Sequence, residues 1–145
     1  MATNALSLIF AALAMVTLTF VVGLTMLFTR MAEIRSKRVH PRQAATSITL
    51  AASLENVQPA DNFRNLFEVP VLFYTLVAMA IAVGFVPPWL TYGAWAFVAL
   101  RVAHSVIHCT YNKVYHRSAV FIAGFALLLA LWVGFAVSLA SLSGP

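Results

Sequence analysis

Residues 101–117 of the chain read RVAHSVIHCTYNKVYHR, a row of ionisable and aromatic side chains inside an otherwise apolar sequence. A charged group in a membrane segment is costly unless it faces a partner or water. A cluster of such groups therefore predicts a functional site. The candidate residues in this row are Arg101, His104, His108, Tyr115 and Arg117.

One face of a helix is predicted to carry Arg101, His104, His108, Asn112 and Tyr115, because these positions fall within an arc of about 100° when each residue turns the helix by about 100°. The preceding apolar segment carries a second polar face. It consists of Asp61, Arg64, Asn65, Glu68 and Thr75. Two polar faces on neighbouring helices are expected to face each other. At a rise of about 1.5 Å per residue, Glu68 and His104 lie at similar depth. We therefore predict that Glu68 pairs with Arg101 or His104, within one subunit or across an interface.

Spacing alone is also compatible with a purely structural role or with metal binding. Glu68 and Arg101 could equally form a buried ion pair that only orients helices. His104 and His108, at positions i and i+4, have the spacing of two ligands to a metal or haem. Without a nearby cysteine or second carboxylate this is a weak metal motif, so no metal site is predicted.

The composition excludes an ordinary soluble domain. Of the 145 residues, 62% are hydrophobic and 9% are charged, and the mean hydropathy is +0.91. The net charge of +5 is accounted for by loops that follow the positive-inside rule, and nucleic-acid binding is not predicted. The single cysteine, Cys109, excludes an intrachain disulfide. The chain is predicted to be an all-α integral membrane protein.

One transmembrane domain, residues 1–145, is predicted to contain four spanning helices, since each of four apolar runs has the length that a bilayer requires. The expected helices cover about 5–34, 60–86, 88–113 and 116–142, and the first is expected to stay uncleaved. Pro70 should remove a backbone hydrogen bond from the second helix. Segment 43–59 is predicted to be an interfacial helix or a structured loop.

The basic residues predict the orientation of these helices. They lie in the first connection, at the start of the second helix and in the third connection, whereas the other loop and the terminal segments carry no charge. Because lysine and arginine of short loops mark the cytoplasmic side, loops 30–60 and 112–117 are predicted to be cytoplasmic. Both termini are then non-cytoplasmic.

Two motifs make the chain resemble the MAPEG superfamily, the membrane-associated proteins of eicosanoid and glutathione metabolism. In NFRNLFEVPVLFY, Asn65 and Glu68 match the family's N-x-x-E, and the R-x-x-H-x-x-x-H run from Arg101 resembles bacterial-type members. The resemblance implies a four-helix bundle that forms a homotrimer. It also implies that glutathione binds as co-substrate in a cytoplasm-facing pocket between subunits, beside a lipophilic substrate from the lipid bilayer.

The resemblance also implies roles for individual residues. Arg117 is the candidate catalytic residue, because a cation lowers the pKa of a thiol and so favours the nucleophilic thiolate. Asn65 and Glu68 would contact the peptide, and Arg38 and Arg42 its carboxylates. The helix-three wall of the same pocket would consist of Arg101, His104, His108 and Tyr115.

The chain departs from the eicosanoid-type pattern at three positions. Asp61 replaces an arginine, and His104 and His108 replace two tyrosines. We therefore predict a membrane-bound glutathione-dependent transferase or peroxidase acting on hydrophobic electrophiles, with no specific eicosanoid substrate. The alternatives are a non-catalytic lipid-binding or scaffold subunit of the same family and, less favoured, a histidine-ligated metal or haem site.

Overall fold

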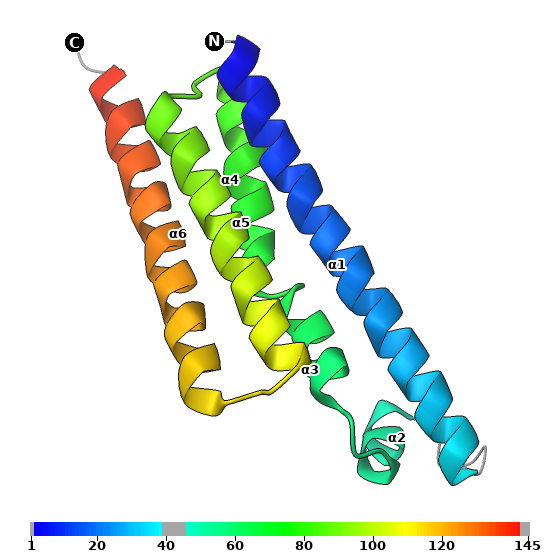
Figure 1. Cartoon of the computed structure of the whole chain (residues 1–145). Coiled ribbons are helices and arrows are strands. Elements are labelled where there is room, and N and C mark those ends of the chain that lie inside the picture. The colour runs from blue at the N-terminus through cyan, green and yellow to red at the C-terminus, as the bar shows by residue number, and fades with distance from the viewer. Residues whose placement is uncertain (1, 39–45, 143–145) are drawn as a thin grey trace.

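A computed structural model describes residues 2–38 and 46–142, and this part of the chain consists of helices joined by short connections, without a strand. Its helices are α1 (Ala2–Lys37), α2 (Ser47–Ser53), α3 (Gln58–Asn65), α4 (Val69–Val83), α5 (Pro88–Cys109) and α6 (Val114–Leu142). Figure 1 shows the long helices side by side, with the short helices α2 and α3 near the far end of α1.

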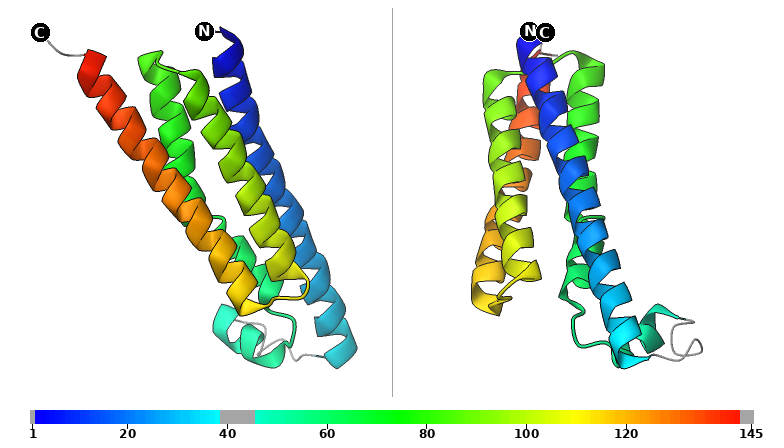
Figure 2. Two further views of the ribbon diagram at one scale, coloured as in Figure 1. Left: turned by 60° about the vertical axis from the view of Figure 1, so that its left-hand side comes forward. Right: turned by 45° about the vertical axis from the view of Figure 1, so that its right-hand side comes forward.

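Within the described ranges, four helical segments are long and apolar enough to cross a membrane. They are Thr3–Lys37, Gln58–Val83, Pro88–Cys109 and Val114–Leu142. This confirms the predicted all-α fold with four candidate membrane-spanning helices. Both ends of the chain lie at one end of the bundle, and the α5–α6 turn lies with α2 and α3 at the other (Figures 1 and 2).

The second predicted helix, expected over 60–86, is interrupted. Residues 66–68 form a turn between α3 and α4, and Glu68 has non-helical backbone angles of φ −97° and ψ −90°. Pro70 stands in the first turn of α4, where a missing amide hydrogen is tolerated. The predicted disturbance of hydrogen bonding at Pro70 is therefore a full break of the helix.

Both turns of the α4–α5–α6 region come earlier than expected. α4 ends at Gly84, whose φ of 72° and backbone bonds to Ala80 and Ile81 form a left-handed cap that glycine adopts without strain. α5 ends at Cys109 and not at about residue 113. Tyr115 therefore belongs to the first turn of α6 and does not continue the polar face of α5.

α5 is the central helix, since it packs against both α1 and α6. Its Phe97 stacks on Phe73 of α4 with ring centroids 4.9 Å apart. The Trp95 indole N–H donates to the Ser7 hydroxyl of α1 at 3.1 Å, and the Trp132 indole N–H of α6 donates to the Leu72 carbonyl of α4 at 3.3 Å. Packing and hydrogen bonds of this kind hold helices together in lipid, where apolar surface alone gives no preference for a neighbouring helix.

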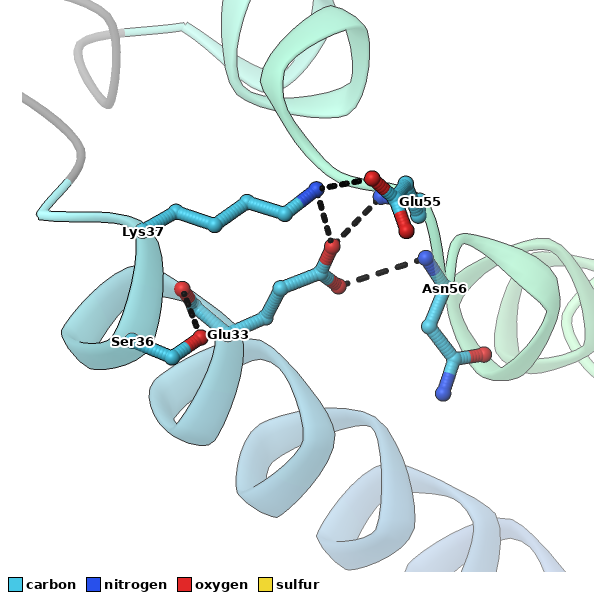
Figure 3. Close-up of polar contacts among 5 residues, drawn as sticks. All are labelled: Glu33, Ser36, Lys37, Glu55 and Asn56. Carbon is cyan, nitrogen blue, oxygen red and sulfur yellow. Dashed lines mark hydrogen bonds and ion pairs between the residues drawn. The ribbon is translucent and has the colours of Figure 1, made fainter.

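A carboxylate on the last turns of α1 holds the segment that leads into α3 (Figure 3). Glu33 accepts the backbone N–H of Glu55 at 2.6 Å and that of Asn56 at 3.2 Å. Lys37 lies 2.9 Å from both the Glu33 and the Glu55 carboxylates. Part of segment 43–59 is thus the seven-residue helix α2, and the end of that segment is fixed to α1.

Candidate functional site

A polar cavity of about 400 Å³ opens between α3, α5 and α6, at the end of the bundle opposite the termini. Each of the three helices supplies side chains to its wall. The lining residues are Asp61, Asn65, His104, His108, Arg117, Ser118, Phe121 and Ile122. Four residues predicted from the sequence thus share one cavity, namely Asn65, His104, His108 and Arg117.

Arg117 is held in this cavity by both histidines. Its guanidinium Nη1 donates to His108 Nε2 at 3.1 Å and to the Asn112 side-chain oxygen at 2.7 Å. Its backbone carbonyl lies 3.2 Å from His104 Nδ1. Asn112 adopts a left-handed φ of 45° in the α5–α6 turn, a conformation that asparagine tolerates better than most residues. The turn and α5 therefore position the first turn of α6.

The two histidines are almost fully buried, with 3% of each side chain exposed, and their rings meet edge to face at a centroid distance of 5.5 Å. Each ring uses one nitrogen to bind Arg117. The other nitrogen, Nε2 of His104 and Nδ1 of His108, is buried without a hydrogen-bond partner. Both rings, which belong to residues that line the cavity, therefore carry one buried hydrogen-bonding position without a partner.

Arg101 lies one turn along α5 from His104 and is 2% exposed. It donates from Nη2 to the Phe121 carbonyl at 3.3 Å, and its guanidinium lies 5.1 Å and 4.8 Å from the ring centroids of Phe97 and Phe121. Gly124 makes room for it, because a Cβ there would lie 2.7 Å from Nη2. Arg101 is thus packed between α5 and α6 and is not among the residues that line the cavity.

The predicted pairing of Glu68 with Arg101 or His104 within one subunit is wrong. Glu68 is exposed at the α3–α4 break, and the ion pairs found in residues 2–38 and 46–142 join Lys37 to Glu33 and Glu55. The prediction assumed a continuous helix, in which Glu68 and Asn65 share a face, and the break between α3 and α4 removes that relation. The alternative, a pair across a subunit interface, involves a second copy of the chain.

Two of the remaining predicted residues, Tyr115 and Arg38, lie apart from the cavity. Tyr115 is 83% exposed at the start of α6, and Arg38 is exposed just after α1 with a left-handed φ of 49°. Arg42 lies outside the described residues. No contact brings Tyr115 or Arg38 to the cavity wall in the described part of the chain.

A buried polar network links α3 to α5 directly behind the cavity and was missed in the sequence. The Asn62 side chain is fully buried, donates to Cys109 Sγ at 3.3 Å and accepts from the Ser105 hydroxyl at 3.5 Å. Asn62 lies between the lining residues Asp61 and Asn65. The network therefore fixes the part of α3 that contributes to the cavity.

The described residues contain no group of three or more histidine, cysteine, aspartate or glutamate side chains placed to hold a metal ion.

An apolar groove of about 700 Å³ runs along α1, α3 and α4. Phe20, Phe63, Phe67 and Tyr74 contribute to it. A groove with this lining suits a lipophilic molecule such as an acyl chain.

The family model described as the MAPEG family matches residues 8–137, nearly the whole chain. No curated protein and no solved structure matches the sequence or the fold.

Proposed function

This chain belongs to the MAPEG family, and we propose that it is a membrane-bound, glutathione-dependent transferase or peroxidase that acts on hydrophobic electrophiles. Family membership supports a membrane protein of glutathione-related or eicosanoid-related metabolism. The observation that carries the more specific proposal is the cavity in which Arg117 stands beside His104 and His108.

The chemistry of a thiol explains why such a cavity suits glutathione. An unperturbed thiol has a pKa of about 8.5, so most of it is protonated and weakly nucleophilic at pH 7. A guanidinium favours the charged form, and Arg117 is held in place by two fixed acceptors, His108 Nε2 and the Asn112 side-chain oxygen. We assign Arg117 to thiolate stabilisation and Asn65 to a contact with the peptide.

The proposal also covers the side of the membrane that the cavity faces and the number of subunits that form the site. The basic residues of α1, α3 and the α5–α6 turn gather at the cavity end, so this end is proposed to face the cytoplasm. We further propose a homotrimer in which the exposed Glu68, Tyr115 and Arg38, together with Arg42, complete the glutathione site across subunit contacts. Native mass spectrometry of the detergent-purified protein would measure the subunit number directly.

A second candidate function is a non-catalytic, lipid-binding subunit, and the apolar groove along α1, α3 and α4 favours it. This function requires no thiol chemistry. It predicts a lipid retained through purification and no effect of glutathione on the protein.

The test is a calorimetric titration of glutathione into the purified protein, followed by ultraviolet absorbance of the bound thiolate and turnover with chlorodinitrobenzene as electrophile. We expect binding, a thiolate signal at pH 7 and conjugation. Arg117→Ala should lose the thiolate signal and at least about 100-fold in turnover, since removal of one donor to a developing charge typically costs this much. Lys113→Ala, which removes an exposed cation outside the cavity, is the matched control and should behave as wild type. Absence of glutathione binding would select the lipid-binding subunit.

A further inference from the structure

The hydrogen bonds to Arg117 determine which nitrogen of each buried histidine carries the proton. A backbone carbonyl only accepts, so His104 Nδ1 must donate to the Arg117 carbonyl, and a neutral ring then has a free lone pair at Nε2. A guanidinium only donates, so His108 Nε2 must accept from Arg117, and the proton of that ring is on Nδ1. Arg117 thus makes His104 a donor at Nδ1 and His108 an acceptor at Nε2.

The free positions of the two rings are complementary. His104 offers an acceptor at Nε2 and His108 a donor at Nδ1, and both atoms are buried without a partner. Buried polar atoms nearly always have a partner in the working state of a protein. A thiol can donate its hydrogen to an acceptor such as His104 Nε2, and a sulfur anion can accept one from a donor such as His108 Nδ1.

We infer that His104 is the general base that takes the proton of the glutathione thiol, and that the His108 Nδ1–H group donates to the resulting sulfur anion together with Arg117. This inference rests on the proposed glutathione-dependent function and adds a proton acceptor to it. The bond from His104 Nδ1 to the Arg117 carbonyl holds the ring in the required tautomer and stabilises the imidazolium once it forms.

Atoms and electrons balance in this step. The S–H bond breaks, its proton moves to His104 Nε2, and its electron pair stays on sulfur. The thiolate attacks an electrophilic carbon, an S–C bond forms, and the bond from that carbon to the leaving group or to an epoxide oxygen breaks. The departing anion carries the electron pair and can take the proton from His104, which restores the neutral ring. No further oxidant, reductant or co-reactant is needed.

Charges from three helices surround this histidine. The charged and titratable groups near His104 are Arg101 and His108 of α5, Arg117 of α6 and Asp61 of α3, and of these His108, Arg117 and Asp61 line the cavity with it. A general base must be neutral before it accepts the proton. The thiolate that forms with the imidazolium neutralises its charge, so proton transfer is tied to the presence of the thiol.

The decisive variant is His104→Asn. The asparagine amide reaches the position of Nδ1 and can keep the bond to the Arg117 carbonyl, but it has no group at the position of Nε2. We expect kcat with glutathione and chlorodinitrobenzene to decrease about 100-fold. In the wild type, protonation of the base lowers kcat/KM at low pH, and this decrease should be absent from the variant. His116→Asn is the control, because His116 is exposed, bonds Tyr111 and lies outside the cavity.

The outcomes separate this inference from the function on which it rests. If the wild type binds and conjugates glutathione, and His104→Asn keeps the wild-type kcat and the decrease of kcat/KM at low pH, then His104 only positions Arg117. That result would overturn this inference and leave the proposed function standing. If wild type does not bind glutathione, both proposals are overturned. If the variant does not fold, magnetic resonance of isotope-labelled histidine nitrogens in the wild type decides. Glutathione should convert one buried, neutral ring into the doubly protonated form, and an unchanged spectrum with bound thiolate would overturn the inference.

Discussion

At the scale of single residues, the most unusual feature is the cation of Arg101 deep inside the bundle. Among the described residues it has no carboxylate partner, and its charge is met by the Phe121 carbonyl and by the faces of two phenylalanine rings. Desolvated contacts between a cation and an aromatic ring are worth about 2 kcal/mol or more. The sequence predicted that this side chain faces inward. It could not predict Phe121 as a partner, because Phe121 lies on α6 and its approach depends on the space that Gly124 leaves.

Gly124→Ala tests this packing. In an exposed helix interior the change would stabilise by about 0.5–1 kcal/mol, but here the added methyl group would lie 2.7 Å from the Arg101 guanidinium. Overpacking of this kind typically costs about 1–3 kcal/mol. We expect a lower midpoint of thermal unfolding in detergent. Ala123→Gly, at the exposed neighbouring position, measures the effect of helix propensity alone, and a raised midpoint in Gly124→Ala would contradict the tight packing of Arg101.

At the scale of elements, the break at residues 66–68 decides which polar side chains reach the cavity. A helical wheel drawn through an unbroken second helix put Asn65 and Glu68 on one face, and Pro70 signalled a disturbance there. The three residues of the turn change the phase, so Asn65 stays at the cavity while Glu68 is exposed. Asn62 could not be found in the sequence, because its importance comes from Ser105 and Cys109 on α5.

Asn62→Ala tests the role of this network in holding α3 against α5. The change removes the hydrogen bonds to Cys109 and Ser105 and leaves the buried Ser105 hydroxyl without its α3 partner. Loss of a buried hydrogen-bond partner costs about 1–3 kcal/mol. We expect a lower unfolding midpoint and, if glutathione binds the cavity, weaker binding by calorimetry. Asn56→Ala, which changes an exposed side chain, should alter neither quantity. Equal stability of the two variants would show that the network does not hold α3.

At the scale of the whole molecule, the two ends of the bundle differ in charge. The described lysine and arginine residues other than Arg101 lie at the end of α1 or just after it, in α3, and around the α5–α6 turn. The opposite end, with both chain ends and the α4–α5 turn, carries none among the described residues. Apolar run length predicted the four candidate spans. The cavity could not be predicted as a volume, because its wall combines three helices whose relative rotation depends on the turns at 66–68 and 110–113.

The charge difference predicts the orientation in the membrane. An even number of spans places both ends of the chain on one side, and the positive-inside rule assigns the cavity end to the cytoplasm. In a Cys109→Ser background, which keeps a hydrogen-bonding group for Asn62, single cysteines are introduced by Lys113→Cys and Ser141→Cys, two exposed positions. A membrane-impermeant maleimide should label the cysteine at 141 in intact cells and the cysteine at 113 only after lysis. The reverse pattern would place the cavity on the outer side, where glutathione is not supplied by the cytoplasm, and would require a different source for the thiol.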